Sequence, residues 1–168
     1  MNGVRLELLG PPEVLCDGRV VSGIGRKAMG LLAYLAVAKG RFHNRDELAN
    51  LLWSDRFDEQ ARQSLRQTLS TLRKTIGDAI ISNDQGIGLT ADKVASDVDQ
   101  FEALAASTDR AAQRQACALY RGEFLEGIQR SAPAFDDWVQ AERRRLRDLL
   151  LGVLEALANR ELAEGGLD

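Results

Sequence analysis

The sequence has no run of 18 apolar residues, so no segment is long and apolar enough to cross a bilayer as a helix. Its first residues, MNGVRLELLG, lack the layout of a secretory signal peptide. Only two cysteines occur, Cys16 and Cys117, and their distance along the chain favours a reduced cytoplasmic pair of core thiols over a disulfide. These absences predict a cytoplasmic protein without a membrane partner.

Residues that carry catalysis or bind metals are also scarce. The single histidine, His43, stands in no constellation of cysteine, histidine and carboxylate ligands, which favours a structural or surface role. The carboxylates of Asp136, Asp137 and Glu142 lie beside the arginines at 143–145, which favours solvated ion pairs over a hydrolytic pair. We therefore expect no enzymatic activity, no cofactor and no metal.

Net charge and aromatic content are both low. Aromatic residues make up 5% of the chain, so the core must be built mostly from leucine, valine, isoleucine and alanine. Residues 1–97 hold 13 Lys+Arg and 12 Asp+Glu, and the whole chain of 168 residues has a net charge of -3. Many nucleic-acid-binding proteins carry a strong positive excess, which is missing here. Any electrostatic function must therefore be local.

The first half of the chain alternates between strand and helix patterns. VRLELLG and PEVLCDGRVV predict a small antiparallel sheet over residues 4–23, with a hairpin turn at Asp17-Gly18. RKAMGLLAYLAVAKG predicts a helix that ends at Gly40. NRDELANLLW predicts a second helix, with Asn44 as its cap and Glu47 completing a capping box.

A third helix follows, and Asp58 is predicted to cap it. Its apolar residues form one stripe and step by three or four positions: Ala61, Leu65, Leu69, Leu72 and Ile76. Gly77 ends this helix, and AIISNDQGIGLT then predicts a second hairpin. Helices at a short turn followed by a hairpin are the layout of a winged helix-turn-helix.

The second half reads as helix throughout. Helices are predicted from Asp97, over residues 109–120, and over a long segment from about Ala134. The apolar side of the long helix holds Phe135, Trp138, Val139, Leu146, Leu149, Leu150, Val153 and Leu157. Antiparallel helix pairs would bury such stripes. Trp53 and Trp138 are interpreted as core anchors. The predicted fold class is α+β, a winged helix with an N-terminal sheet followed by an all-α domain.

Several segments resemble a known family. LLGPPEVLCDGRVV, RKAMGLLAYLAV, RDELANLLW and DEQARQSLRQTLSTLRKTIG are similar to the OmpR-type winged helix of antibiotic-regulatory-protein (SARP) transcription regulators. DVDQFEAL, ALYRGEFLEG and FDDWVQAERRRLRDLLLGVLEALA resemble the bacterial transcriptional activation domain (BTAD) that follows it. The resemblance implies a DNA-binding domain at 1–95 and an incomplete, tetratricopeptide-like activation domain at 96–168. Members often continue into further repeats, an ATPase module or a nucleotide cyclase.

In this family the third helix reads DNA, so the resemblance assigns recognition to residues 59–76. The outward positions of that helix are Arg62, Gln63, Arg66, Gln67, Ser70, Arg73 and Lys74. Arginine and glutamine suit guanine and adenine edges, while serine and lysine suit phosphates. We therefore expect Arg62, Arg66 and Gln67 near bases, and Ser70, Arg73 and Lys74 near the backbone. Further candidates for backbone contact are Arg26, Lys27, Arg41 and Arg45, although the favoured interpretation of each is plain surface charge.

The expected partners are double-stranded DNA, a second copy of the chain or a tandem site, and RNA polymerase. One feature favours a different class of function: the second hairpin contains Asp84 and no lysine or arginine between Ile80 and Thr90. The alternative is a regulatory protein-interaction module of a larger signalling protein, such as a nucleotide cyclase or an ATPase-linked regulator.

Overall fold

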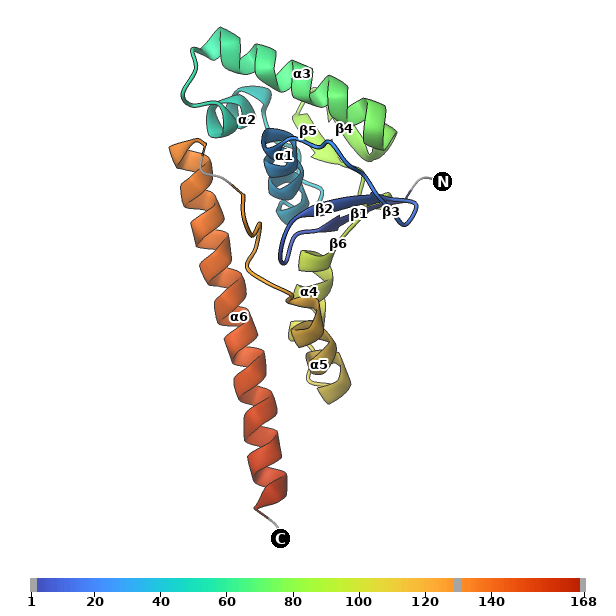
Figure 1. Ribbon diagram of the computed structural model, residues 1–168, viewed down its shortest axis with the longest axis vertical. Helices are drawn as coiled ribbons and strands as arrows, with labels where there is room; N and C mark the ends of the chain where they lie inside the picture. Colours follow the sequence, from blue (N-terminus) through green and yellow to red (C-terminus); the bar gives the residue numbers. More distant parts are fainter. Residues whose placement is uncertain (1–2, 129–130, 167–168) are drawn as a thin grey trace.

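A computed structural model describes residues 3–128 and 131–166 of the chain. The sheet-forming half precedes the helical half, as Figure 1 shows. The elements in chain order are β1 (Val4–Glu7), β2 (Glu13–Cys16), β3 (Arg19–Val20), α1 (Arg26–Val37), α2 (Arg45–Leu52), α3 (Asp58–Ile76), the 3-10 turn η1 (Gly77–Ala79), β4 (Ile80–Asn83), β5 (Gly86–Leu89), β6 (Val94–Ser96), α4 (Asp97–Ala105), α5 (Arg110–Leu119) and α6 (Pro133–Gly165).

The N-terminal sheet has four strands in the order β3-β2-β1-β6. β2 and β3 form the predicted hairpin, with Asp17 and Gly18 at positive φ values of 51° and 81°. The fourth strand was not predicted: β6 pairs with β1 in parallel, and Val94 lies opposite Val4. β6 therefore forms one edge of the sheet, although its residues follow the β4–β5 hairpin in the chain.

α1, α2 and α3 with the β4–β5 hairpin form the predicted winged helix-turn-helix. All five stripe residues of α3 are buried, and Gly77 ends the helix with a φ of 58°. Asn44 caps α2 by accepting hydrogen bonds from the backbone N–H groups of Asp46 and Glu47. The predicted cap of α3 is wrong, because Phe57 occupies that position and Asp58 is the first helical residue. Asp58 still acts favourably there, since an acid in the first turn complements the helix dipole.

The helical half contains a short antiparallel pair, α4 and α5, and the long helix α6. α6 begins one residue before the predicted start, with Pro133 in its first turn. Phe135, Val139, Leu146 and Val153 are buried along it, and Trp138 packs against the same core. At its other end α6 meets α5, where Arg110 lies 2.5 Å from Glu164. Trp53 is also buried, so both tryptophans are core anchors as predicted.

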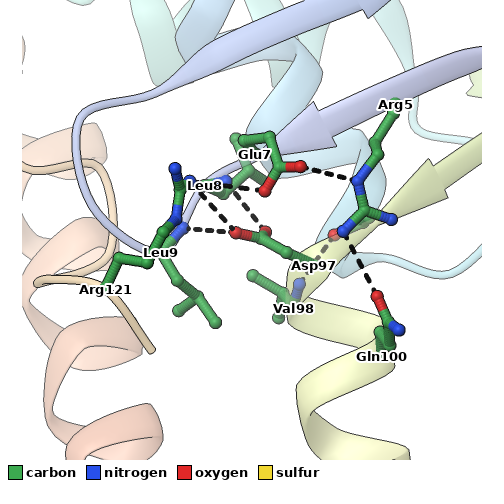
Figure 2. Close-up of polar contacts among 9 residues, drawn as sticks. Arg5, Glu7, Leu8, Leu9, Asp97, Val98, Gln100 and Arg121 are labelled. Carbon is green, nitrogen blue, oxygen red and sulfur yellow. Dashed lines mark hydrogen bonds and ion pairs between the residues drawn. The ribbon is translucent and has the colours of Figure 1, made fainter. Parts of the chain in front are cut away.

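The two halves are joined by a network around Asp97, drawn in Figure 2. The carboxylate of Asp97 is fully buried, and it accepts hydrogen bonds from the backbone N–H groups of Leu8 at 2.8 Å and Leu9 at 2.9 Å. Arg121 lies 3.3 Å from Glu7 and 3.9 Å from Asp97. Burial raises the pKa of Asp97, although the two N–H groups and Arg121 favour its charged form. One side chain at the start of α4 thus holds the segment that follows β1.

Backbone hydrogen bonds strengthen this junction. Leu125 donates to the carbonyl of Leu8, and Gly10 donates to the carbonyl of Glu123. The guanidinium of Arg143 donates at 2.8 Å to the carbonyls of Phe124 and Leu125, and only 13% of its side chain is exposed. The prediction of a solvated ion pair is therefore wrong for Arg143, which supports the connector before α6.

The predicted core thiols are only partly buried. Cys16 and Cys117 are free, and both are of intermediate exposure. Cys16 lies at the end of β2 with its Sγ 3.9 Å from the carbonyl of Thr75. The structure forms no disulfide between them, and neither side chain belongs to the centre of the core.

Candidate nucleic-acid interface

The outward face of α3 is a continuous polar surface. Its seven predicted positions are all exposed: Arg62, Gln63, Arg66, Gln67, Ser70, Arg73 and Lys74. The α3 sequence has no acidic residue after Glu59, so its last 17 residues carry only positive charge. The buried stripe on the opposite face fixes which side of the helix points outward.

The N-terminal part of this face contains acidic partners. Arg62 donates to Asp46 of α2 at 2.7 Å, and its pKa is raised by that hydrogen bond and by the negative charge of Asp46. Arg66 lies 3.4 Å from Glu59 and donates to Gln63 at 3.1 Å. Both arginine side chains are about half exposed, so the acids orient them without covering them. These acidic partners would have to be exchanged for nucleic acid on binding.

The C-terminal part of the face is joined to the hairpin. Arg73 donates a hydrogen bond to the hydroxyl of Ser82 on β4. Within residues 3–128 and 131–166, the side chains of Gln67, Ser70 and Lys74 make no hydrogen bond or ion pair, so they are available to a ligand. The face therefore holds both pre-oriented and free polar groups.

The wing, β4 and β5 with their turn, is held firmly against the segment before α2. The backbone groups of His43 and Ile87 exchange hydrogen bonds of 2.9 Å in both directions. A Cβ at Gly86 would lie 1.9 Å from the carbonyl oxygen of His43, so only glycine fits there. The exposed tip carries Asp84. The wing can therefore approach a duplex as a fixed unit, although its tip has the same charge as phosphate.

His43 itself is packed in the fold. Its side chain is 13% exposed, its Nδ1 lies 3.7 Å from Glu47, and its ring meets the edge of Tyr34 at 5.0 Å. This placement agrees with the structural role predicted from the sequence. In the part of the chain that the structure describes, no three His, Cys, Asp or Glu residues group as a metal site.

An open groove of about 450 Å³ runs beside α3. The sequence analysis did not predict that this groove adds polar side chains to the candidate interface. It lies between α3, the N-terminus of α1 and the turn that follows α2. Its polar lining includes Arg26, Lys27, Arg56, Gln67, Thr68 and Thr71. Arg56 donates to Ser64 at 2.9 Å, which aims it along α3. The signal available in the sequence was the arginine in SDRF, directly before the predicted recognition helix.

The other candidate cations differ in their surroundings. Lys27 is partly buried, with its Nζ donating to the carbonyl of Leu52 and lying 5.8 Å from the ring centre of Trp53. Burial lowers the pKa of Lys27. Its interpretation as surface charge is therefore wrong, because it supports the C-terminus of α2. Arg41 donates to the carbonyl of Ala38 at 3.3 Å, while Arg45 is exposed in the first turn of α2.

A duplex has a clear route to α3. Figure 1 shows α3 at one end of the molecule, with α4 and α5 on the far side of the β3-β2-β1-β6 sheet. α6 packs on the winged helix through α1 and α2. The helical half therefore leaves the outward face of α3 uncovered. None of the helices formed by residues 3–128 and 131–166 has the length and apolar character needed to span a membrane.

Comparisons with known proteins agree with this architecture. Residues 21–90 match the family "Transcriptional regulatory protein, C terminal", and residues 92–168 match "Bacterial transcriptional activator domain". The chain is 26% identical to Regulatory protein AfsR of Streptomyces griseus. The match covers 98% of this chain but only 18% of AfsR. EmbR of Mycobacterium tuberculosis, solved with a low-affinity phosphopeptide, is 24% identical and superposes with a TM-score of 0.76 over 98% of this chain and 47% of that one.

A winged helix of this family joined to an activator domain defines a transcription regulator, and both matched families are regulatory rather than catalytic. The two matched domains, in this order, agree with the resemblance to SARP-type regulators. The likeness to EmbR shows the shared fold, a winged helix followed by a helical region.

Proposed function

We propose that the chain activates transcription in the cytoplasm by inserting α3 into the major groove of double-stranded DNA. Arg62, Arg66 and Gln67 lie near bases, where a well-placed base contact contributes about 1–3 kcal/mol of discrimination. The backbone contacts come from Gln63, Ser70, Arg73, Lys74 and Arg45. The observation that carries this proposal is the exposed face of α3, which has no acidic residue after Glu59 and is turned away from the helical half.

The groove beside α3 supplies a second set of backbone contacts. Arg56 and the hydroxyls of Thr68 and Thr71 line it on the side of α3 that faces α1. Hydroxyl and guanidinium groups are common phosphate ligands. A duplex seated on α3 would therefore gain backbone contacts from this groove in addition to those from the outward face of α3.

One copy brings few cations to a duplex, and the wing tip carries Asp84. Each phosphate contact adds salt-dependent attraction, so one copy with few contacts would bind weakly. We therefore infer binding as a homodimer or at tandem sites. The helical half, from about residue 96 onward, orients the second copy and offers surface to RNA polymerase. The family name of the matched domain supports the activator role.

The test is a titration of the purified chain against promoter-derived and random duplexes at two salt concentrations. We expect salt-sensitive binding that Arg66→Ala weakens mostly for the promoter-derived duplex. Arg73→Ala should weaken binding to both duplexes and reduce the slope of log K against log salt by about 0.9. Arg144→Ala is the matched control, since Arg144 is an exposed arginine on α6.

If the Arg66 and Arg144 variants bound DNA equally well, α3 would not be part of the DNA-binding interface. Absence of binding at micromolar protein and low salt would instead favour a regulatory protein-interaction module of a larger signalling protein. That alternative has its own support in Asp84 at the wing tip and in the acidic partners of Arg62 and Arg66.

A further inference from the structure

A cavity of about 320 Å³ lies where the winged helix meets the helical half. Its volume is within the range of small-molecule sites in proteins. The walls come from the end of α1, the end of β5, β6 and the first turns of α4. Most of the lining is apolar, including Leu35, Ala36, Leu89, Ala91 and Val94. Such a cavity suits a short carbon chain.

Of the two carboxylates near the polar end of the cavity, Glu102 and Asp99, only Glu102 forms ion pairs within the described part of the chain. Glu102 takes both neighbouring cations, because Lys39 lies 2.6 Å and Arg145 lies 2.5 Å from its oxygens. Asp99 lines the cavity, and its side chain takes part in no hydrogen bond or ion pair among the described residues. Its Oδ1 is shielded from water. One carboxylate therefore lacks the donor that a buried oxygen requires.

The groups around Asp99 favour a ligand whose hydrogen-bond donor is positively charged. Lys39 and Gly40 line the cavity where α1 ends, and the C-terminus of a helix carries partial negative charge. An anionic ligand would meet this helix end and the Asp99 carboxylate while the nearest cations are already paired with Glu102. Burial raises the pKa of Asp99, and the charge of Lys39 at the cavity wall opposes this shift only in part. A cation with several N–H donors fits all of these features.

We propose that this cavity binds a small aliphatic primary amine. Its ammonium group donates to Asp99, and rotation of the soft terminal torsion of Asp99 brings either oxygen to the cavity. Its carbon chain packs against Leu35, Leu89 and Val94. The bound amine bridges α1 and β5 to α4, so it stabilises the junction of the two halves. This binding is independent of the DNA-binding function.

The probe is isoamylamine, titrated calorimetrically into the purified chain and followed by thermal unfolding. Isoamyl alcohol and isovalerate have the same branched carbon chain with a neutral and an anionic end. We expect saturable one-to-one binding of the amine, a rise in Tm, and no saturation by isovalerate. Loss of a charged hydrogen-bond partner weakens binding by roughly tenfold or more, which is the effect expected for Asp99→Asn.

Two further variants complete the design. Asp92→Asn removes an exposed carboxylate of the neighbouring turn and should bind the amine like the parent chain. Ala91→Phe places a ring at the mouth of the cavity and should abolish binding while the fold is kept. The proposal is overturned if millimolar isoamylamine shows no saturable binding, if Asp99→Asn binds as well as Asp92→Asn, or if isovalerate binds as tightly as the amine.

Discussion

Replacement of Asp97 tests how the winged helix is fixed to the helical half. Asp97→Ala removes the acceptor of two backbone N–H groups, those of Leu8 and Leu9, in a site with no access to water. Asp97→Asn keeps one carbonyl oxygen and turns an amide donor toward the second N–H group. The two variants therefore differ in the number of buried donors left without an acceptor.

The expected losses follow from that difference. A buried donor without a partner costs about 1–3 kcal/mol, so the Asn variant should lose stability by that amount. Two such donors would cost the Ala variant about 2–6 kcal/mol. The loss should fall in the lower part of this range, because the variant no longer has to desolvate a carboxylate. Burial raises the pKa of Asp97, which indicates that this desolvation is substantial.

Urea unfolding followed by circular dichroism measures the free energies, and native-state hydrogen exchange measures protection of the Leu8 and Leu9 amides. Both amides should lose protection in Asp97→Ala, and the order of stability should be parent, Asn, Ala. Asp148→Ala, at an exposed position of α6, is the control and should stay within about 0.5 kcal/mol of the parent. If Asp97→Ala also stayed within that margin, with both amides protected, the carboxylate would not hold this segment.

Two further changes test the same junction. Gly30→Ala would place a Cβ 2.7 Å from the ring of Phe135, so unfolding in urea should show a loss of about 1–3 kcal/mol from overpacking, partly offset by better helix propensity. A Phe135→Leu change in the same chain should reduce the loss, and an equal loss would rule out the ring contact. For Glu102, burial raises the pKa, but the hydrogen bonds from Lys39 and Arg145 outweigh burial and lower it below 4.5. The stability from Glu102 is then present above pH 4.5 and is lost as the pH falls through the folded-state pKa. Acid titration of stability should therefore be less steep in Glu102→Gln, and identical curves would refute the ion-pair assignment.

Local patterns were sufficient to predict most elements of the fold. The four-residue spacing of apolar residues such as Leu65 and Leu69 predicted the buried stripe of α3, and the Asp17-Gly18 pair predicted the first hairpin. The parallel pairing of β6 with β1 was missed, because it joins residues about 90 positions apart and leaves no mark in either segment. The cap at Phe57 was missed because a carboxylate one position later is equally compatible with a helix start.

The candidate interface was predictable only in part. Helical periodicity determines that Arg62 and Arg66 point outward once the stripe is known. Periodicity says nothing about the partner of a long side chain, so the pairing of Arg62 with Asp46 emerged only from the packing of α2 on α3. Likewise, Lys27 could not be distinguished from surface charge until the end of α2 was found beside it.

The pairing of β1 with β6 limits how this regulator can be divided or recombined. β6 lies inside the segment that matches the activator domain, yet its hydrogen-bonding partner is the first strand of the chain. A winged helix excised after residue 90 would expose a strand edge and lose the carboxylate beneath it. Exchange of either half with another regulator must therefore carry β1 and β6 together, as a single inherited unit.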